Sequence, residues 1–121
     1  MTQELGPIVR GELRITTSMA GSWTVLVCAG DLDVTTSSAL RTAIQQASLE
    51  TDVVVDLDNV AFIDSTALGV LIAGQKRIER AGRALRIVVT NPTILRIIAI
   101  TGLDDMFTLC ASLQDALAPL L

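Results

Sequence analysis

Apolar residues near the start of the chain follow two patterns that are typical of β-strands. Leu13 and Ile15 alternate with polar neighbours, whereas residues 23–29 form a nearly continuous apolar run rich in valine. Alternation indicates a strand with one buried face, and a short continuous run indicates a strand buried on both faces. With Gly21-Ser22 between the two segments, the pattern predicts a β-hairpin made of residues 13–17 and 23–29.

The first ten residues show no clear hydrophobic period. They contain Gly6-Pro7, a pair that is typical of turns and loops. The whole chain has 121 residues, which is the ordinary size of one domain. We therefore expect an N-terminal arm over residues 1–10 and a single domain over residues 11–121.

Apolar residues return every three or four positions in four later segments, which predicts a helix in each. Thr35 or Thr36 is suited to cap the first of these helices. Gly82 and Gly102 are placed to end the second and the third. The expected helices cover residues 35–49, 64–80, 91–100 and 112–120.

Three further apolar runs lie between the helices and predict strands. Residues 52–58 hold three consecutive valines between acidic residues, which suits a strand in the middle of a sheet. The other two runs cover residues 84–89 and 106–110. Strands that alternate with helices define the α/β class, so we expect a mixed sheet of about five strands with about four helices and right-handed crossovers.

The composition excludes several classes of function. The chain has no histidine, which rules out a Ser-His-Asp triad, a histidine zinc site and a phosphohistidine carrier. Its net charge of -4 is the wrong sign for a protein that mainly neutralises nucleic-acid phosphates. We therefore expect a protein as the partner, with no direct nucleic-acid binding, no metal, no cofactor and no enzymatic activity.

The N-terminus has neither a basic segment nor an apolar core of a signal peptide, and no apolar stretch reaches the length of a membrane span. This pattern favours a cytoplasmic protein that does not enter a membrane. The two cysteines, Cys28 and Cys110, are far apart in sequence and do not form a CxxC pair. They are expected to be buried reduced thiols, with a regulatory disulfide as the alternative.

Charge is unevenly distributed along the chain. Residues 31–64 hold seven acidic residues and one basic residue, whereas residues 76–86 hold five basic residues and one acidic residue. The basic segment is typical of a solvated helix end, with contact to nucleic acid or to an acidic partner as the alternative. We expect a molecule with an acidic region and a basic region.

Residues 69–76 approach the pattern of a phosphate-binding loop. However, Gln75 stands where that motif has lysine, and no Ser or Thr follows Lys76. The segment also has the period of a helix interior. A nucleotide-binding loop is therefore not expected here.

The segment most suggestive of function is Asp64-Ser65-Thr66, which follows an acidic strand end and a short apolar segment predicted as a loop over residues 60–63. Functional groups of α/β proteins gather beyond the carboxyl ends of parallel strands, where helix N-termini also point. The alternative is that the three side chains only satisfy the free N–H groups of the first helical turn. Local chemistry alone leaves both interpretations open.

Three segments together resemble a known family. Gly30-Asp31-Leu32-Asp33, the run from Phe62 to Leu71, and Thr101-Gly102-Leu103 are similar in order and spacing to the anti-sigma factor antagonists, which are single STAS domains. The resemblance covers roughly residues 11–119, and it implies a STAS-like fold that agrees with the predicted order of elements. The chain differs from the family at Ala67, where glycine is common.

The resemblance implies specific roles for residues of this chain. Ser65 corresponds to the family's phosphorylated serine, and Thr66 is at most a minor acceptor. The implied partner is an anti-sigma factor that is also an ATP-dependent serine kinase, and a PP2C-like phosphatase would remove the phosphate. The unphosphorylated protein, a monomer or weak dimer, would bind the anti-sigma factor and free its sigma factor. The residues expected to contact the partner are Asp31, Asp33, Asp64, Ser65, Thr66, Leu68 and Gly69.

Two other functions remain as alternatives. The first is a stand-alone STAS subunit of a lipid-transport ATPase or a sensory complex, which would bind a partner without being phosphorylated and dephosphorylated. The second is an enzyme or a small-molecule sensor, which the absence of histidine, of a metal-ligand cluster and of an intact phosphate loop disfavours.

Overall fold

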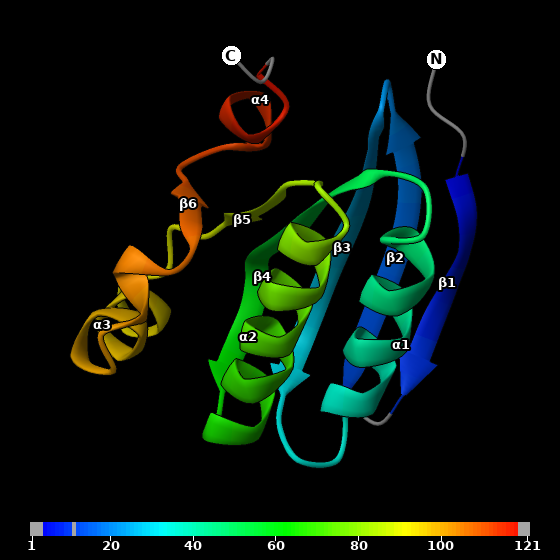
Figure 1. The fold of residues 1–121 in the computed structure, drawn as a ribbon. Coiled ribbons are helices and arrows are strands. Elements are labelled where there is room, and N and C mark those ends of the chain that lie inside the picture. Colours follow the sequence, from blue (N-terminus) through cyan, green and yellow to red (C-terminus); the bar gives the residue numbers. More distant parts are fainter. Residues whose placement is uncertain (1–3, 11, 119–121) are drawn as a thin grey trace.

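A computed structural model describes residues 4–10 and 12–118 and contains one six-stranded β-sheet with the strand order β1-β2-β3-β4-β5-β6 (Figure 1). The strands are β1 Glu4–Arg10, β2 Leu13–Ala20, β3 Trp23–Leu32, β4 Asp52–Ile63, β5 Leu85–Val88 and β6 Thr108–Cys110. The helices are α1 Ser37–Ala47, α2 Ser65–Arg80, α3 Pro92–Ile100 and α4 Leu113–Ala116, with a 3-10 turn at Leu103–Asp105.

The sheet is mixed, as the sequence predicted. Strands β1, β2 and β3 are antiparallel neighbours, whereas β3, β4, β5 and β6 are parallel. Strand β4 lies inside the sheet, and its Val53, Val54 and Val55 are fully buried. The α/β class, the hairpin and the inner position of this strand are therefore confirmed.

The N-terminal residues differ from the expected arm. Residues 4–10 form strand β1, which pairs with β2 along one edge of the sheet and brings the number of strands to six. The register shifts between Leu5 and Ile8, at Gly6-Pro7. Because proline cannot donate to the ladder and the shift interrupts the alternation of side chains, the sequence pattern hides this strand.

Strand β4 is longer than predicted. Residues 60–63, expected as a loop, continue the strand to Ile63 after register shifts against β3. Each shift places an extra residue in β4, which breaks the alternation that identifies a strand in a sequence. The start of α2 is therefore carried to the far end of a 12-residue strand.

Helices α1 and α2 lie side by side on the same face of the sheet (Figure 1). Their apolar residues join those of the strands in the main core, in which Leu40, Ile44, Leu71 and Ile78 are almost completely buried. Burial of a Leu or Ile side chain contributes about 1.5–3 kcal/mol, so this layer provides much of the stability of the fold. The predicted helical periods of both segments are confirmed.

A smaller core contains Trp23, Val25, Val54 and Val88 from the strands together with Ala116 from α4. The Arg86 guanidinium lies 4.8 Å from the centre of the Trp23 ring. Its Nη1 donates hydrogen bonds to the carbonyl oxygens of Ala116 at 2.9 Å and Ala118 at 2.8 Å, which anchors the end of α4. The helix predicted over 112–120 is shorter in the structure, and residues 119–120 lie outside the described ones.

Among the described residues, no helix combines the length and the hydropathy that crossing a membrane requires.

Candidate functional site

The carboxyl ends of β3 and β4 and the beginnings of α1 and α2 meet at one end of the sheet, the lower end in Figure 1. Leu32 and Ile63 are the last paired residues of the two strands. The backbone N–H of Asp64 then donates to the Leu32 carbonyl at 3.1 Å, which extends the pairing by one residue. The predicted site residues therefore follow directly from two neighbouring strands.

Asp64 links the two segments that leave these strands. It is the N-cap of α2, and its Oδ1 accepts a hydrogen bond from the Ala67 N–H at 3.0 Å. Its Oδ2 accepts a hydrogen bond from the Val34 N–H in the β3–α1 loop at 2.9 Å. One carboxylate thus caps the helix and holds a loop that lies 30 positions earlier in the sequence.

Ser65 and Thr66 occupy the first turn of α2, and both are exposed. Within the described part of the chain, neither hydroxyl takes part in a hydrogen bond, and the side-chain cap of this turn, to the Ala67 N–H, comes from Asp64. The interpretation that all three side chains cap the helix therefore holds for Asp64 alone. The two exposed residues lie at the positively polarised end of a 16-residue helix.

Asp33 shapes the neighbouring loop. Its Oδ1 accepts hydrogen bonds from the N–H of Thr35 at 2.9 Å and of Thr36 at 3.0 Å, and its own N–H donates to Thr36 Oγ1 at 3.0 Å. Thr36 is the N-cap residue of α1, as predicted, but its side chain makes no capping hydrogen bond. Its hydroxyl instead donates to the Asp31 carbonyl at 2.8 Å.

These hydrogen bonds bring the acidic residues of the predicted site to one end of the sheet. Asp33 precedes Val34, whose N–H is bound to Asp64, and Asp31 pairs with Phe62 two residues before Asp64. The structure thus places Asp31, Asp33 and Asp64 near Ser65. Among the described residues, it shows no group of three or more side chains arranged to hold a metal ion.

Leu68 and Gly69, also expected at the site, have different environments. Leu68 is only 5% exposed and belongs to the main core, so it supports α2 from beneath. Gly69 is exposed, and a Cβ added there would meet no atom within 4 Å. The outer surface of α2 next to Ser65 is therefore bare, which allows another molecule to approach the helix backbone closely.

Two exposed apolar side chains in this region were not among the predicted site residues. Val34 is 70% exposed in the β3–α1 loop, and Phe62 is 51% exposed near the end of β4. Exposed aromatic and aliphatic residues are frequent in protein interfaces. The sequence held one usable signal, a single apolar residue inside the polar stretch of residues 33–38.

Asp56 and Asp58 belong to a different part of the sheet. Asp58 Oδ1 accepts hydrogen bonds from the N–H of Thr90 at 2.9 Å and from its hydroxyl at 3.0 Å. It lies five residues before Ile63, about 16 Å away at the rise of a strand, so its carboxylate is not part of the site around Ser65. Partial burial and the nearby Asp58 carboxylate raise the pKa of Asp56. The hydrogen bond that the Asp56 carboxylate accepts from the Asp58 N–H acts in the opposite direction and lowers this pKa.

The cysteines cannot form a disulfide with each other in this fold. Cys28 is in β3 and Cys110 is in β6, with β4 and β5 between them. Three strand spacings amount to about 14 Å, far more than the Cα separation of a disulfide. Burial, and to a smaller extent Asp56, raises the pKa of the fully buried Cys28 to about 12. The expectation of burial holds for Cys28, whereas Cys110 is partly exposed.

The segment that resembles a phosphate-binding loop lies inside α2. Residues 69–76 are all helical, so their backbone N–H groups do not form the cradle that a phosphate needs. The conclusion that this segment is not a nucleotide loop is consistent with that position.

Comparisons with known proteins agree with this geometry. A sequence profile of the STAS domain matches residues 12–116. The anti-sigma-B factor antagonist of Bacillus subtilis is 31% identical over 84 residues, which cover 69% of this chain and 77% of that protein. The anti-sigma-F factor antagonist RsfB of Mycobacterium tuberculosis is 35% identical over 95 residues, which cover 77% of each chain.

Among solved structures, an anti-sigma factor antagonist from Mycobacterium paratuberculosis superposes with a TM-score of 0.80 and 29% identity, over 87% of this chain and 91% of that one. The profile match over residues 12–116 includes strands β2 to β6, the four helices and Ser65. It therefore concerns the whole domain rather than a single motif.

Proposed function

Because this chain belongs to the STAS domain family of anti-sigma factor antagonists, we propose that it is a phosphorylation-controlled antagonist of this kind. In its unphosphorylated form it binds an anti-sigma factor that is also a serine kinase, and the sigma factor is thereby freed. Transfer of a phosphoryl group from ATP to Ser65 releases the antagonist. Thr66 is at most a minor acceptor.

The observation that carries this proposal is the state of the Ser65 hydroxyl. It is exposed at the first turn of α2, and the task of capping the helix is done by Asp64. Phosphorylation of Ser65 therefore removes no hydrogen bond found among the described residues. A phosphate at the start of a helix is also stabilised by the helix dipole, by about 0.3–1 kcal/mol.

The effect of the phosphate is expected at the interface. A phosphoserine adds about -1.5 to -2 charges at pH 7. These charges appear beside Asp64 and on the same end of the sheet as Asp31 and Asp33, while Val34 and Phe62 offer apolar contact area nearby. A partner surface adapted to a neutral hydroxyl then meets a concentrated negative charge, which costs several kcal/mol at an interface. The antagonist stays folded and loses its partner.

The rest of the cycle follows from this scheme. A PP2C-like phosphatase hydrolyses the phosphoserine and returns the antagonist to its binding form. The antagonist itself is a cytoplasmic monomer or weak dimer that catalyses no reaction and does not contact DNA. Asp31, Asp33, Asp64, Ser65, Thr66 and Gly69 form the contact surface, and Leu68 supports it from the core.

The test compares wild type, Ser65→Ala and Ser65→Asp in calorimetric binding to the anti-sigma factor isolated from the native cell with this protein as bait. Ser65→Asp is expected to bind at least about tenfold more weakly, a loss of about 1.4 kcal/mol. Incubation with that kinase and ATP should label wild type once and leave Ser65→Ala almost unlabelled. Thr93→Asp is the matched control, because it adds the same charge to the exposed first turn of α3.

Both aspartate variants should have unfolding free energies within about 0.5 kcal/mol of wild type, since aspartate is well tolerated at the start of a helix. The proposal fails if Ser65→Asp binds like wild type while Ser65→Ala does not bind, because the hydroxyl would then be a contact and not a switch. Full labelling of Ser65→Ala would move the acceptor elsewhere.

A further inference from the structure

The outer side of the helical layer contains a groove between α1 and α2. It has a volume of about 450 Å³. Its floor includes Ile44 of α1 and Val70 and Gly74 of α2, all of which are buried. The helices are so close together here that a Cβ added to Gly74 would lie 3.1 Å from Ile44 Cγ2. We call this feature the α1–α2 groove; it begins beyond the first turn of α2 that carries Ser65.

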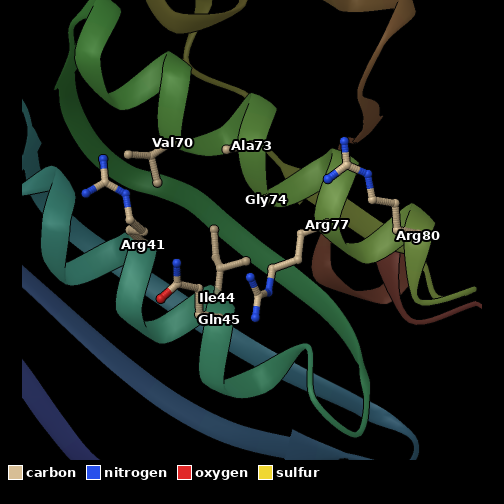
Figure 2. A pocket seen from close by; sticks show the side chains of 8 residues that line it. All are labelled: Arg41, Ile44, Gln45, Val70, Ala73, Gly74, Arg77 and Arg80. Atoms are coloured by element: carbon tan, nitrogen blue, oxygen red, sulfur yellow. The ribbon is translucent and has the colours of Figure 1, made fainter.

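Three arginines surround this apolar floor. Arg41 and Arg77 extend from opposite helices toward the space between them, and Arg80 follows one turn further along α2 (Figure 2). All three are exposed, and none has an ion-pair partner within residues 4–10 and 12–118. Helix α1 contains no acidic residue, and the one acid of α2, Glu79, accepts a hydrogen bond from Gln75 Nε2 at 2.8 Å. The groove is therefore lined by positive charge alone in a chain whose net charge is -4.

The helix dipole accounts for only part of this arrangement. Arg77 and Arg80 lie in the last turn of α2, where a cation is favourable. Arg41 lies in the second turn of α1, closer to the positive N-terminal end, and gains nothing from that dipole. It lies on the α1 wall of the groove, beside Val70 of α2 (Figure 2), where its guanidinium can bind a carboxylate through paired hydrogen bonds.

The chemistry of the walls favours carboxylates of a protein over the phosphates of a nucleotide. Both walls are helix interiors whose backbone N–H groups are already bonded within the helices, so the groove lacks the helix N-terminus or glycine-rich loop that usually holds phosphate. Its lining also contains no aromatic residue on which a base could stack. The binding groups that remain are the guanidinium groups of the three arginines around a narrow apolar floor.

We propose that the α1–α2 groove binds an acidic amphipathic helix of a protein partner. The stretch from Val70 to Arg80 spans about 15 Å along α2, which matches about three turns of a bound helix. The apolar stripe of that helix packs on the floor, and its Asp and Glu side chains pair with the arginines on either side. This proposal is independent of the Ser65 switch, because it uses other residues of the two helices.

The test uses a defined probe, a fluorescent peptide of about four turns with leucines at helical spacing and glutamates on both sides of the leucine stripe. We expect it to bind wild type and to shift the amide NMR signals of Ala73 and Gly74. The groove variant Arg41→Glu/Arg77→Glu should weaken binding at least tenfold. The matched control Lys76→Glu/Arg96→Glu changes the net charge equally at exposed helical positions outside the groove and should stay within about threefold of wild type.

A charge swap completes the test. The same peptide with lysine in place of every glutamate should bind the groove variant better than it binds wild type. If the charge-reversed variant does not fold, the neutral variant Arg41→Gln/Arg77→Gln takes its place, and the lysine peptide should again bind it better than it binds wild type. Ser65→Ala should bind the glutamate peptide like wild type, so failure here is distinct from failure of the phosphorylation switch.

The proposal is overturned if the glutamate peptide does not bind wild type at low ionic strength, if the control variant weakens binding as much as the groove variant, or if the shifted amides lie outside the groove. Displacement of the peptide by ATP or inorganic phosphate at lower concentration would show a small-anion site and overturn it as well.

Discussion

Replacing Asp64 tests whether one carboxylate joins the two halves of the site. In Asp64→Ala the N-cap of α2 is lost, which costs about 1 kcal/mol. The hydrogen bond from the Val34 N–H is lost too. A hydrogen bond to a charged acceptor contributes about 1.5–3 kcal/mol, but this N–H is exposed and water can replace the partner, so we count about 1 kcal/mol. The expected loss of unfolding free energy is about 2 kcal/mol.

Two further variants separate these contributions. Asp64→Asn keeps one acceptor oxygen in place of two and should lose about half as much. Asp31→Asn removes the same charge from a carboxylate that accepts no hydrogen bond from the described residues, and it should stay within about 0.5 kcal/mol of wild type. The measurement is urea unfolding. If the dependence of the unfolding free energy on urea concentration is unchanged, a loss of 2 kcal/mol in unfolding free energy lowers the midpoint by about 1 M urea. If Asp64→Ala is no less stable than Asp31→Asn, the bridging role of Asp64 is wrong.

Three more predictions follow from other parts of the structure. Gly69→Ala should raise the unfolding free energy by about 0.5–1 kcal/mol, because nothing lies within 4 Å of the added methyl group, whereas Gly74→Ala should gain less or lose stability; equal gains in urea unfolding would contradict the close helix contact. The raised pKa of Asp56 means that the folded state binds this proton more tightly than the unfolded chain does, so the unfolding free energy falls as the pH rises above the ordinary aspartate pKa. Asp56→Asn should therefore be more stable than wild type at pH 7 and should lose this advantage in acid. A difference in unfolding free energy that does not change with pH would refute the reasoning. Because burial raises the pKa of Cys28 to about 12, a thiol reagent should modify Cys110 alone in the native protein and both cysteines after denaturation, and mass spectrometry that finds native Cys28 modified would contradict this.

The sequence was sufficient where structure depends on residues close together in the chain. The valine run of β4, the helical periods of α1 and α2, and the stops at Gly82 and Gly102 all appear in the structure because strand period, helix period and left-handed glycine are local properties. The residues of the Asp64-Ser65-Thr66 segment could be singled out for the same reason, since a helix start after a strand has a local pattern.

Other features depend on residues that are distant in sequence and meet only in the folded chain. Strand β1 exists because β2 supplies its hydrogen-bond partners, and the extension of β4 through its register shifts depends on β3. No residue between 60 and 63 carries a local sign of that pairing, because an extra residue in one strand is defined only against the other.

The site itself required the same kind of information. The sequence could name Asp64 and Ser65, but it could not assign capping to the first and exposure to the second, because that division depends on where the Asp64 oxygens point. One of them meets the Val34 N–H from the β3–α1 loop. Arg41 and Arg77 are 36 positions apart in the chain and line one groove only because Ile44 and Gly74 let two helices pack closely. Local period and capping chemistry therefore determine the elements, whereas hydrogen bonds and close packing between distant segments decide which side chains are free to act.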